Sequence, residues 1–151
     1  MRQNVQSLLA RRVGDAATSI VTTTKAMPSE RLTWIPLDNG RCVSELLADC
    51  IHGNSRVAKI IPTRSFENLP EAPDWKATDL PELHRLLLDS AEKYAEVVMA
   101  VPDEDLEVEF DAPWGKIVLG DGLFHPYWNM VYHEGQINYI QTLYGDKEMH
   151  F

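Results

Sequence analysis

Three polar side chains stand on the core-facing side of the segment over residues 122–143. At about 100° of rotation per helical residue, Asn129 lies about 40° and Gln136 about 60° from His133. The apolar members of that face are Met130, Ile137, Ile140 and Tyr144. A buried polar group without a partner costs about 1–3 kcal/mol. The three groups therefore predict either a satisfied hydrogen-bond network or a site for a ligand or metal ion.

The segment over residues 43–61 offers the facing wall, because its apolar stripe also follows helical spacing. Asp49 and Gly53 lie at the edge of that stripe, about 100° and 60° from Cys50. Asp49 is interpreted either as a solvated carboxylate or as an inward-facing ligand opposite His133. His52 lies about 160° from Cys50, so we expect it to point away from the core.

Two further features bear on chemistry. His125 precedes Pro126 at the start of the last helical segment, and it is interpreted either as a surface histidine or as lining the mouth of a pocket. Cys42 and Cys50 fall in one helical segment, about 12 Å apart at 1.5 Å per residue. That separation is too long for a disulfide, so both thiols are expected to be free.

The elements that position these residues are predicted from apolar periodicity. Helices are expected over about 4–25, 43–61, 79–101 and 122–143, with Pro62 closing the second, Thr78 capping the third and Gly145 ending the fourth. The connection 62–78 is long enough to cross the bundle, which would make the second and third helices parallel. Residues 106–111 alternate as a strand does, and 117–119 are interpreted as a second strand or as the start of the last helix.

The predicted fold class is therefore all-α: a four-helix bundle with a long crossover between its second and third helices. In one of the two interpretations above, a short β-hairpin precedes the last helix. The whole chain, residues 1–151, is expected to form one domain.

Several motifs, in this order along nearly the whole chain, resemble those of the DinB-like superfamily, which also includes bacterial thiol transferases. The final helix carries the family-like stretch Tyr132-His133-Glu134-Gly135-Gln136-Ile137, followed by Tyr144-Gly145. The loop into the second helix and the segment before the last helix resemble the family's at residues 32–36, 40–48, 112–115 and 119–121.

The resemblance implies a four-helix bundle, a homodimer, and often a divalent metal held by one histidine of the second helix and a His-x-x-x-His pair of the last. Carried over by position, the last ligand is His133, whereas Asn129 and Asp49 stand where the other two histidines are expected. An asparagine carbonyl is a weak zinc ligand, so the altered set favours harder ions. The metal considered is Zn, Ni or Mn, with Gln136, Gly53 and His125 expected to line the pocket.

Two functions follow from this pattern. The first is a divergent metal-dependent hydrolase or small-thiol transferase, in which a metal lowers the pKa of a bound water or thiol. The alternative is a non-enzymatic bundle that has lost the metal and binds a small ligand or a partner, with Asp49 and His133 hydrogen-bonded directly. A purely structural dimer without a site is a third, weaker interpretation.

Composition argues against some classes of binding partner. Fourteen basic residues against twenty-three acidic ones give a net charge of −9, which argues against nucleic acid and against an anionic membrane surface. No run approaches the roughly 18 apolar residues of a membrane span. No apolar segment typical of a secretory signal follows Met1. These features predict a cytoplasmic protein with reduced thiols.

Overall fold

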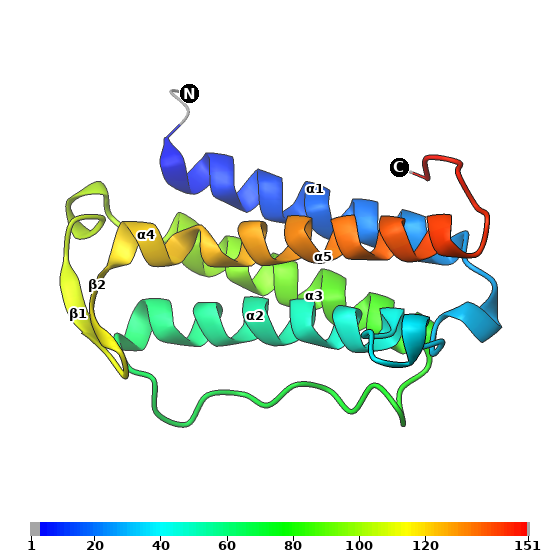
Figure 1. Ribbon diagram of the computed structural model, residues 1–151. Helices are drawn as coiled ribbons and strands as arrows, with labels where there is room; N and C mark the ends of the chain where they lie inside the picture. Colours follow the sequence, from blue (N-terminus) through cyan, green and yellow to red (C-terminus); the bar gives the residue numbers. More distant parts are fainter. Residues whose placement is uncertain (1–3, 151) are drawn as a thin grey trace.

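Four long helices pack side by side in the computed structural model, which describes residues 4–150. They are α1 (Val5–Lys25), α2 (Val43–Thr63), α3 (Leu80–Met99) and α5 (His125–Leu143). In Figure 1, α1 and α5 run in one direction and α2 and α3 in the other. The predicted four-helix bundle is confirmed. Residues 1–3, which belong to the segment where no secretory signal is expected, lie outside the described range.

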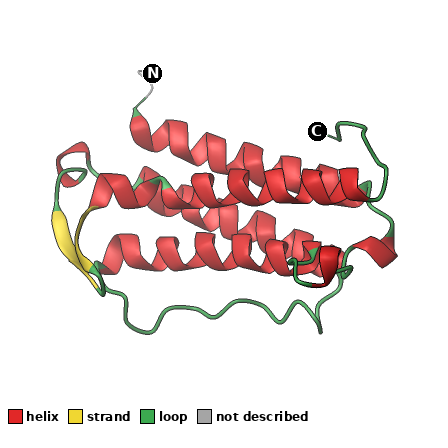
Figure 2. Ribbon diagram, viewed as in Figure 1, coloured by secondary structure: helices red, strands yellow, loops and turns green. Residues whose placement is uncertain are grey.

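The crossover between α2 and α3 runs along the outside of the bundle from one end to the other, as Figure 2 shows. It returns the chain to the end where α2 began, so α2 and α3 are parallel neighbours, as predicted. Helix α3 also packs on α1, and α5 closes the bundle against α1 and α2. None of the described helices is long and apolar enough to span a bilayer.

The core between the helices is apolar and is crossed by a few buried hydrogen bonds. Each buried leucine-sized side chain contributes about 1.5–3 kcal/mol relative to exposure. The fully buried Tyr94 donates a hydrogen bond to the carbonyl of Leu123 at 2.6 Å. The Asn54 amide donates to Ser90 Oγ at 3.1 Å, joining α2 to α3. Apolar side chains buried at 0–1% exposure come from all four helices: Leu9, Val13, Leu46, Leu47, Leu83, Leu87, Met130 and Ile137.

Two predicted helix boundaries are corrected. Thr78 does not cap α3; its hydroxyl donates to the carbonyl of Asp74, and Asp79 is the cap, accepting from Glu82 N at 3.0 Å. Pro62 does not close α2, because it removes only one hydrogen bond in the last turn. That helix ends one residue later at Thr63, and the left-handed cap residue Arg64 (φ 51°) donates its backbone N–H to Ile60 O.

The segment before the last helix forms the hairpin that was one of two interpretations. Strand β1 (Glu109–Ala112) pairs antiparallel with β2 (Gly115–Val118), and Phe110 lies opposite Ile117. The turn uses Gly115 at φ 132°, a conformation that glycine adopts without strain. Short 3₁₀ turns at Ser29–Arg31, Pro36–Asp38 and Asp103–Asp105 complete the connections.

The last helical segment is divided in two, whereas the sequence predicted one helix from residue 122. Helix α4 (Leu119–Leu123) begins earlier than expected, because the N–H of Leu119 and Gly120 donate to the carbonyls of Val108 and Leu106 at 2.9 Å. The break at Phe124 follows from Pro126, which has no N–H for the carbonyl of Gly122. At the other end, left-handed Gly145 (φ 97°) follows the cap residue, as expected.

Candidate functional site

A polar contact joins α2 to α5 in the middle of their shared seam. His133 Nε2 lies 2.9 Å from Asp49 Oδ2. The imidazole is buried, whereas the carboxylate side chain is 37% exposed. His133 Nδ1 lies 2.6 Å from Gln136 Oε1, one turn further along α5. Both ring nitrogens of His133 are therefore within hydrogen-bond distance of protein oxygens.

Arg41, just before α2, completes this cluster. Its Nη1 donates to the same Asp49 Oδ2 at 3.0 Å, and its Nε donates to Glu45 Oε1 at 2.9 Å. One carboxylate oxygen is thus in contact with both a guanidinium and an imidazole. We call Arg41, Glu45, Asp49, His133 and Gln136 the seam network.

The charges in the seam network shift the pKa of its carboxylate. Burial raises the pKa of Asp49, but the hydrogen bond and charge of Arg41 outweigh burial, and contact with His133 adds to them. The pKa of Asp49 is lowered as a result. For Arg41, burial lowers the pKa, and the bonds to Asp49 and Glu45 raise it by more. Both groups are therefore held in their charged forms.

Asn129 lies next to the seam network, close to the α2 backbone. Its Nδ2 is 3.5 Å from the carbonyl oxygen of Asp49. A Cβ built on Gly53 would stand 2.9 Å from that same Nδ2, so a glycine leaves the room that the amide occupies. Asn129 is buried, and its amide nitrogen faces α2.

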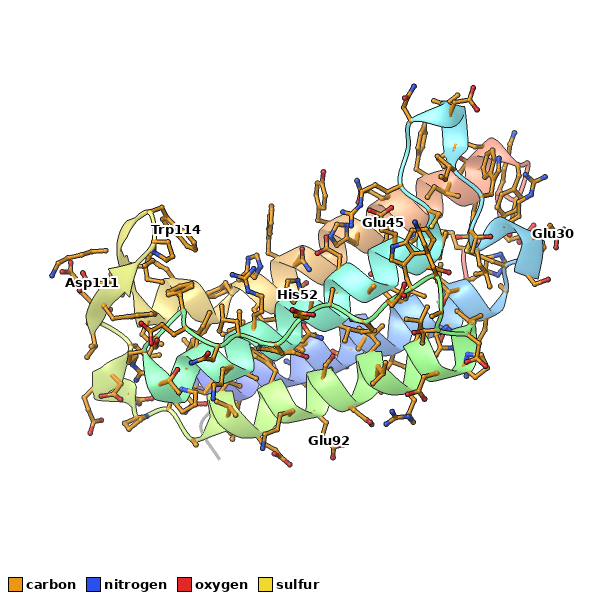
Figure 3. The ribbon with its side chains drawn as sticks, turned by 90° about the horizontal axis from the view of Figure 1, so that it is seen from below. Glu30, Glu45, His52, Glu92, Asp111 and Trp114 are labelled. Carbon is orange, nitrogen blue, oxygen red and sulfur yellow. The ribbon has the colours of Figure 1, made fainter. Side chains whose placement is uncertain are left out.

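A cavity of about 440 Å³ opens beside the seam network, towards the C-terminal end of α2. This volume is in the range of small-molecule pockets. Its polar wall includes Asp49, His52, Arg56, His125 and Asn129. Its apolar wall comes from α2, the crossover, the hairpin and α4: Val57, Ile60, Ile61, Phe66, Phe110, Trp114, Ile117 and Leu119. Figure 3 shows His52 midway along α2 and Trp114 on the hairpin at the end of the bundle.

The structure separates the predicted pocket residues. Gly53 and His125 line the cavity, whereas Gln136 lines a shallower groove on the other side of the seam network, together with Arg41. The His125 side chain stands at the cavity mouth, where burial and the charge of Arg56 lower its pKa against the opposing effect of Asp49. His52 is half-buried in the cavity wall, so it faces inward more than predicted.

The residues that the resemblance assigns to a metal do not form a suitable donor set. Asp49 and His133 are bonded to each other, and Asn129 presents its amide nitrogen. The guanidinium of Arg41 lies on the carboxylate oxygen that an ion would need. Within residues 4–150, no three His, Cys, Asp or Glu side chains gather so as to hold a metal ion. We therefore derive no step through a metal.

Two arginines of the site, Arg41 and Arg56, were not predicted from the sequence. Arg41, Glu45 and Asp49 are each four residues apart. This spacing would place them on one face of a helix that extended back to Arg41. Asp49, Gly53 and Arg56 are likewise spaced by four and three. Each spacing is a signal that could have placed these cations beside Asp49. The aromatic wall carries no such signal, because it depends on how the crossover and hairpin pack.

Comparison with known proteins supports the fold. No family model and no curated protein matches the sequence. YfiT from Bacillus subtilis, described as a probable metal-dependent hydrolase with an unusual four-helix bundle topology, superposes with a TM-score of 0.79 at 14% identity, over 96% of this chain and 93% of that one. The DinB-like protein YjoA from the same organism gives a TM-score of 0.70 at 15% identity, over 95% and 96%.

These likenesses, with the crossover and the hairpin, define the class of fold. The chain has the DinB-like four-helix-bundle fold. At such low identity the likeness extends to the fold alone, and the site must be argued from its own residues.

Proposed function

We propose that this protein binds a small, largely apolar molecule in the cavity beside α2, with the seam network occupying the position of a metal centre. The observation that carries the proposal is the shared carboxylate oxygen of Asp49, which accepts a hydrogen bond from Arg41 and lies 2.9 Å from His133 Nε2. A fixed cation at 3.0 Å repels a second cation and satisfies the carboxylate. The adjoining cavity stays available to a ligand.

The position of His133 favours binding over acid–base catalysis. A general base must reach the proton that it removes, directly or through one water. His133 is 3% exposed, does not line the cavity and lies within hydrogen-bond distance of oxygens through both ring nitrogens. The cavity instead presents an apolar wall, which suits the burial of a hydrocarbon surface.

A fluorescent probe tests this function. N-phenyl-1-naphthylamine is neutral and brightens in apolar surroundings, so we expect saturable binding with one site per chain. Ile117→Trp, which fills the cavity from β2, is expected to abolish that binding. Val108→Trp adds the same ring at an exposed position outside the cavity and should leave it unchanged. No saturable binding to the unmodified protein would refute the function.

The likeness to YfiT favours a second candidate, a metal-dependent hydrolase or small-thiol transferase. In this chain it would require Arg41 to leave Asp49. Thermal unfolding in the presence of Zn, Ni or Mn separates the two functions: the metal-dependent candidate predicts a raised melting temperature, and the binding function predicts none. A rise that persists in Asp49→Ala would come from another site.

We also propose that the protein is a homodimer formed through the outer face of α5. Phe124, at the N-cap, begins a stripe of exposed side chains that continues at three- and four-residue steps with Trp128, Val131, Gly135 and Tyr139. The only Asp, Glu, Lys or Arg within α5 is Glu134, which accepts a hydrogen bond from Ser19. Interface cores are poor in charge and rich in aromatic residues, as this stripe is.

We propose that the protein is cytoplasmic. Cys42 and Cys50 are both buried free thiols, which supports the predicted cytoplasmic setting.

A further inference from the structure

The cavity wall contains a cation that has no partner among the residues that the structure describes. Arg56 lies on α2, half-buried, and its side chain makes no ion pair or hydrogen bond with any residue between 4 and 150. By contrast, Arg41 and Arg64 are both held by carboxylates. A guanidinium removed in part from water is stabilised when an oxyanion meets it.

The two carboxylates of the cavity do not supply that oxyanion. Asp49 is within 3.0 Å of both Arg41 and His133, so its charge is already matched. Asp121 is exposed at the rim and forms no ion pair with Arg56. The other polar groups include donors: the nearest atoms to a Cβ built on Gly53 are those of the Asn129 amide and His125 Nε2. The α2 side of the cavity therefore suits a single negative charge.

The opposite side of the cavity is aromatic. The rings of Phe66 and Phe110 stack with centroids 6.2 Å apart, and Trp114 meets Phe66 edge-on at 5.2 Å. These rings come from the crossover, from β1 and from the hairpin turn. They offer flat apolar surface to a hydrocarbon or aromatic tail.

We propose that the ligand is a monocarboxylate with an aliphatic or aromatic tail, its carboxylate bound by Arg56 and its tail packed against Phe66, Phe110 and Trp114. The inference rests on the proposed binding function and adds the ligand's charge and polarity. One unpaired guanidinium matches one carboxylate in a two-bonded, side-on arrangement. A polyanion such as a nucleotide would bring charge that a protein of net charge −9 leaves unmatched.

Displacement of N-phenyl-1-naphthylamine by octanoate and by octanol tests the inference, because the two competitors share a tail length and differ in charge. On the unmodified protein we expect octanoate to displace the probe at a concentration about tenfold or more below that of octanol. In Arg56→Gln, octanoate should lose this advantage, measured as the ratio of the octanol and octanoate concentrations that displace the probe from that variant. Lys59→Gln removes an exposed charge from the same helix and should behave as the unmodified protein does.

The outcomes are distinct. Equal displacement by octanol and octanoate, or an unchanged octanoate advantage in Arg56→Gln, overturns the carboxylate inference and leaves the binding function standing. Failure of the probe to bind the unmodified protein overturns both. Loss of the advantage in Lys59→Gln as well would assign it to overall charge, which also contradicts a role for Arg56.

Discussion

At the scale of residues, the chemistry of the site depends on a single oxygen atom. Asp49 Oδ2 lies 3.0 Å from Arg41 Nη1 on one side and 2.9 Å from His133 Nε2 on the other. Arg41 and Asp49 are 41% and 37% exposed, so solvent screens their ion pair and its contribution is modest, whereas the buried imidazole of His133 depends on its contact with the carboxylate. The seam network is therefore expected to act as one unit.

The lowered pKa of Asp49 predicts a pH dependence of stability. A carboxyl whose pKa is depressed on folding contributes stability above its unfolded value, ordinarily 3.8, and loses it as pH falls through the folded pKa. Asp49→Asn should remove that contribution, about 1 kcal/mol after solvent screening at a half-exposed carboxylate. Urea unfolding at pH 7 and pH 3 measures it, and the variant's deficit should shrink at the lower pH.

Asp15→Asn provides the control, since it removes an exposed carboxylate 3.8 Å from Arg12 on α1. A deficit in Asp49→Asn that is equally large at both pH values would show that the charge of Asp49 is not what stabilises the seam.

A second residue-scale prediction concerns the metal. If Arg41 and the amide of Asn129 are what prevent metal binding, Arg41→Gln/Asp49→His/Asn129→His should create a His₃ set with His133. We expect that variant to bind Zn²⁺ in calorimetry and the unmodified protein not to. The Arg41→Gln single variant separates loss of the blocking cation from gain of ligands. No zinc binding by the triple variant would contradict this account of the site.

Some of the residues at the site could be placed from the sequence. Projection placed His133 and Asn129 on the inward face of the last helix, because the geometry of one helix fixes which side chains share a face. It left Asp49 open between a solvated carboxylate and an inward-facing ligand. Direct contact between Asp49 and His133 was one of the alternatives, and choosing it required the register between α2 and α5, which the sequence does not give. Arg41 lies before the helix, outside the projection that found Asp49.

At the scale of elements, the cavity exists because the crossover and the hairpin meet at one end of the bundle (Figure 1). Phe66 belongs to a segment without regular structure and is held against Phe110 and Trp114. Such a segment is expected to open more readily than the helices beside it.

Phe66→Ala tests this junction. It should weaken probe binding and speed amide hydrogen exchange in the hairpin, residues 109–118, without lowering the melting temperature by more than a few degrees. Trp75→Ala, in the same crossover but with no aromatic contact to the hairpin, is the matched control. Unchanged exchange in Phe66→Ala would show that the hairpin is positioned by other contacts.

The start of a helix cannot always be predicted from the residues next to it. Pro126, in the first turn of α5, was recognised as lying near a helix start, yet the short helix α4 was not separated, because its start depends on hydrogen bonds to Leu106 and Val108. The parallel course of α2 and α3 was predicted correctly because only a long connection can produce it.

At the scale of the whole molecule, charge and shape favour self-association through α5. Two copies of a protein of net charge −9 repel each other, and this repulsion is weakest when the surfaces that face each other carry no charge. The outer face of α5 is such a surface, with Trp128 at 60% and Tyr139 at 63% exposure and Gly135 open between them. Two copies could approach closely at that glycine.

Val131→Glu is predicted to convert the dimer to a monomer, because it places a charge in the middle of that face, where Val131 is 43% exposed and contributes little to the core. Sedimentation velocity gives the mass in solution. Leu88→Glu makes the same change on α3 at 41% exposure and should remain dimeric. A monomeric unmodified protein, or a dimeric Val131→Glu variant, would contradict an interface on α5.

The central claim, a cavity that binds ligand beside a seam held by Arg41, Asp49 and His133, is tested most directly by one diffraction measurement. Crystals soaked in Zn, Ni and Mn together with octanoate would be measured at each metal's absorption edge. We expect no anomalous peak between Asp49 and His133, with Arg41 in place and octanoate density against Arg56. An anomalous peak bonded to Asp49 and His133, with Arg41 displaced, would contradict it.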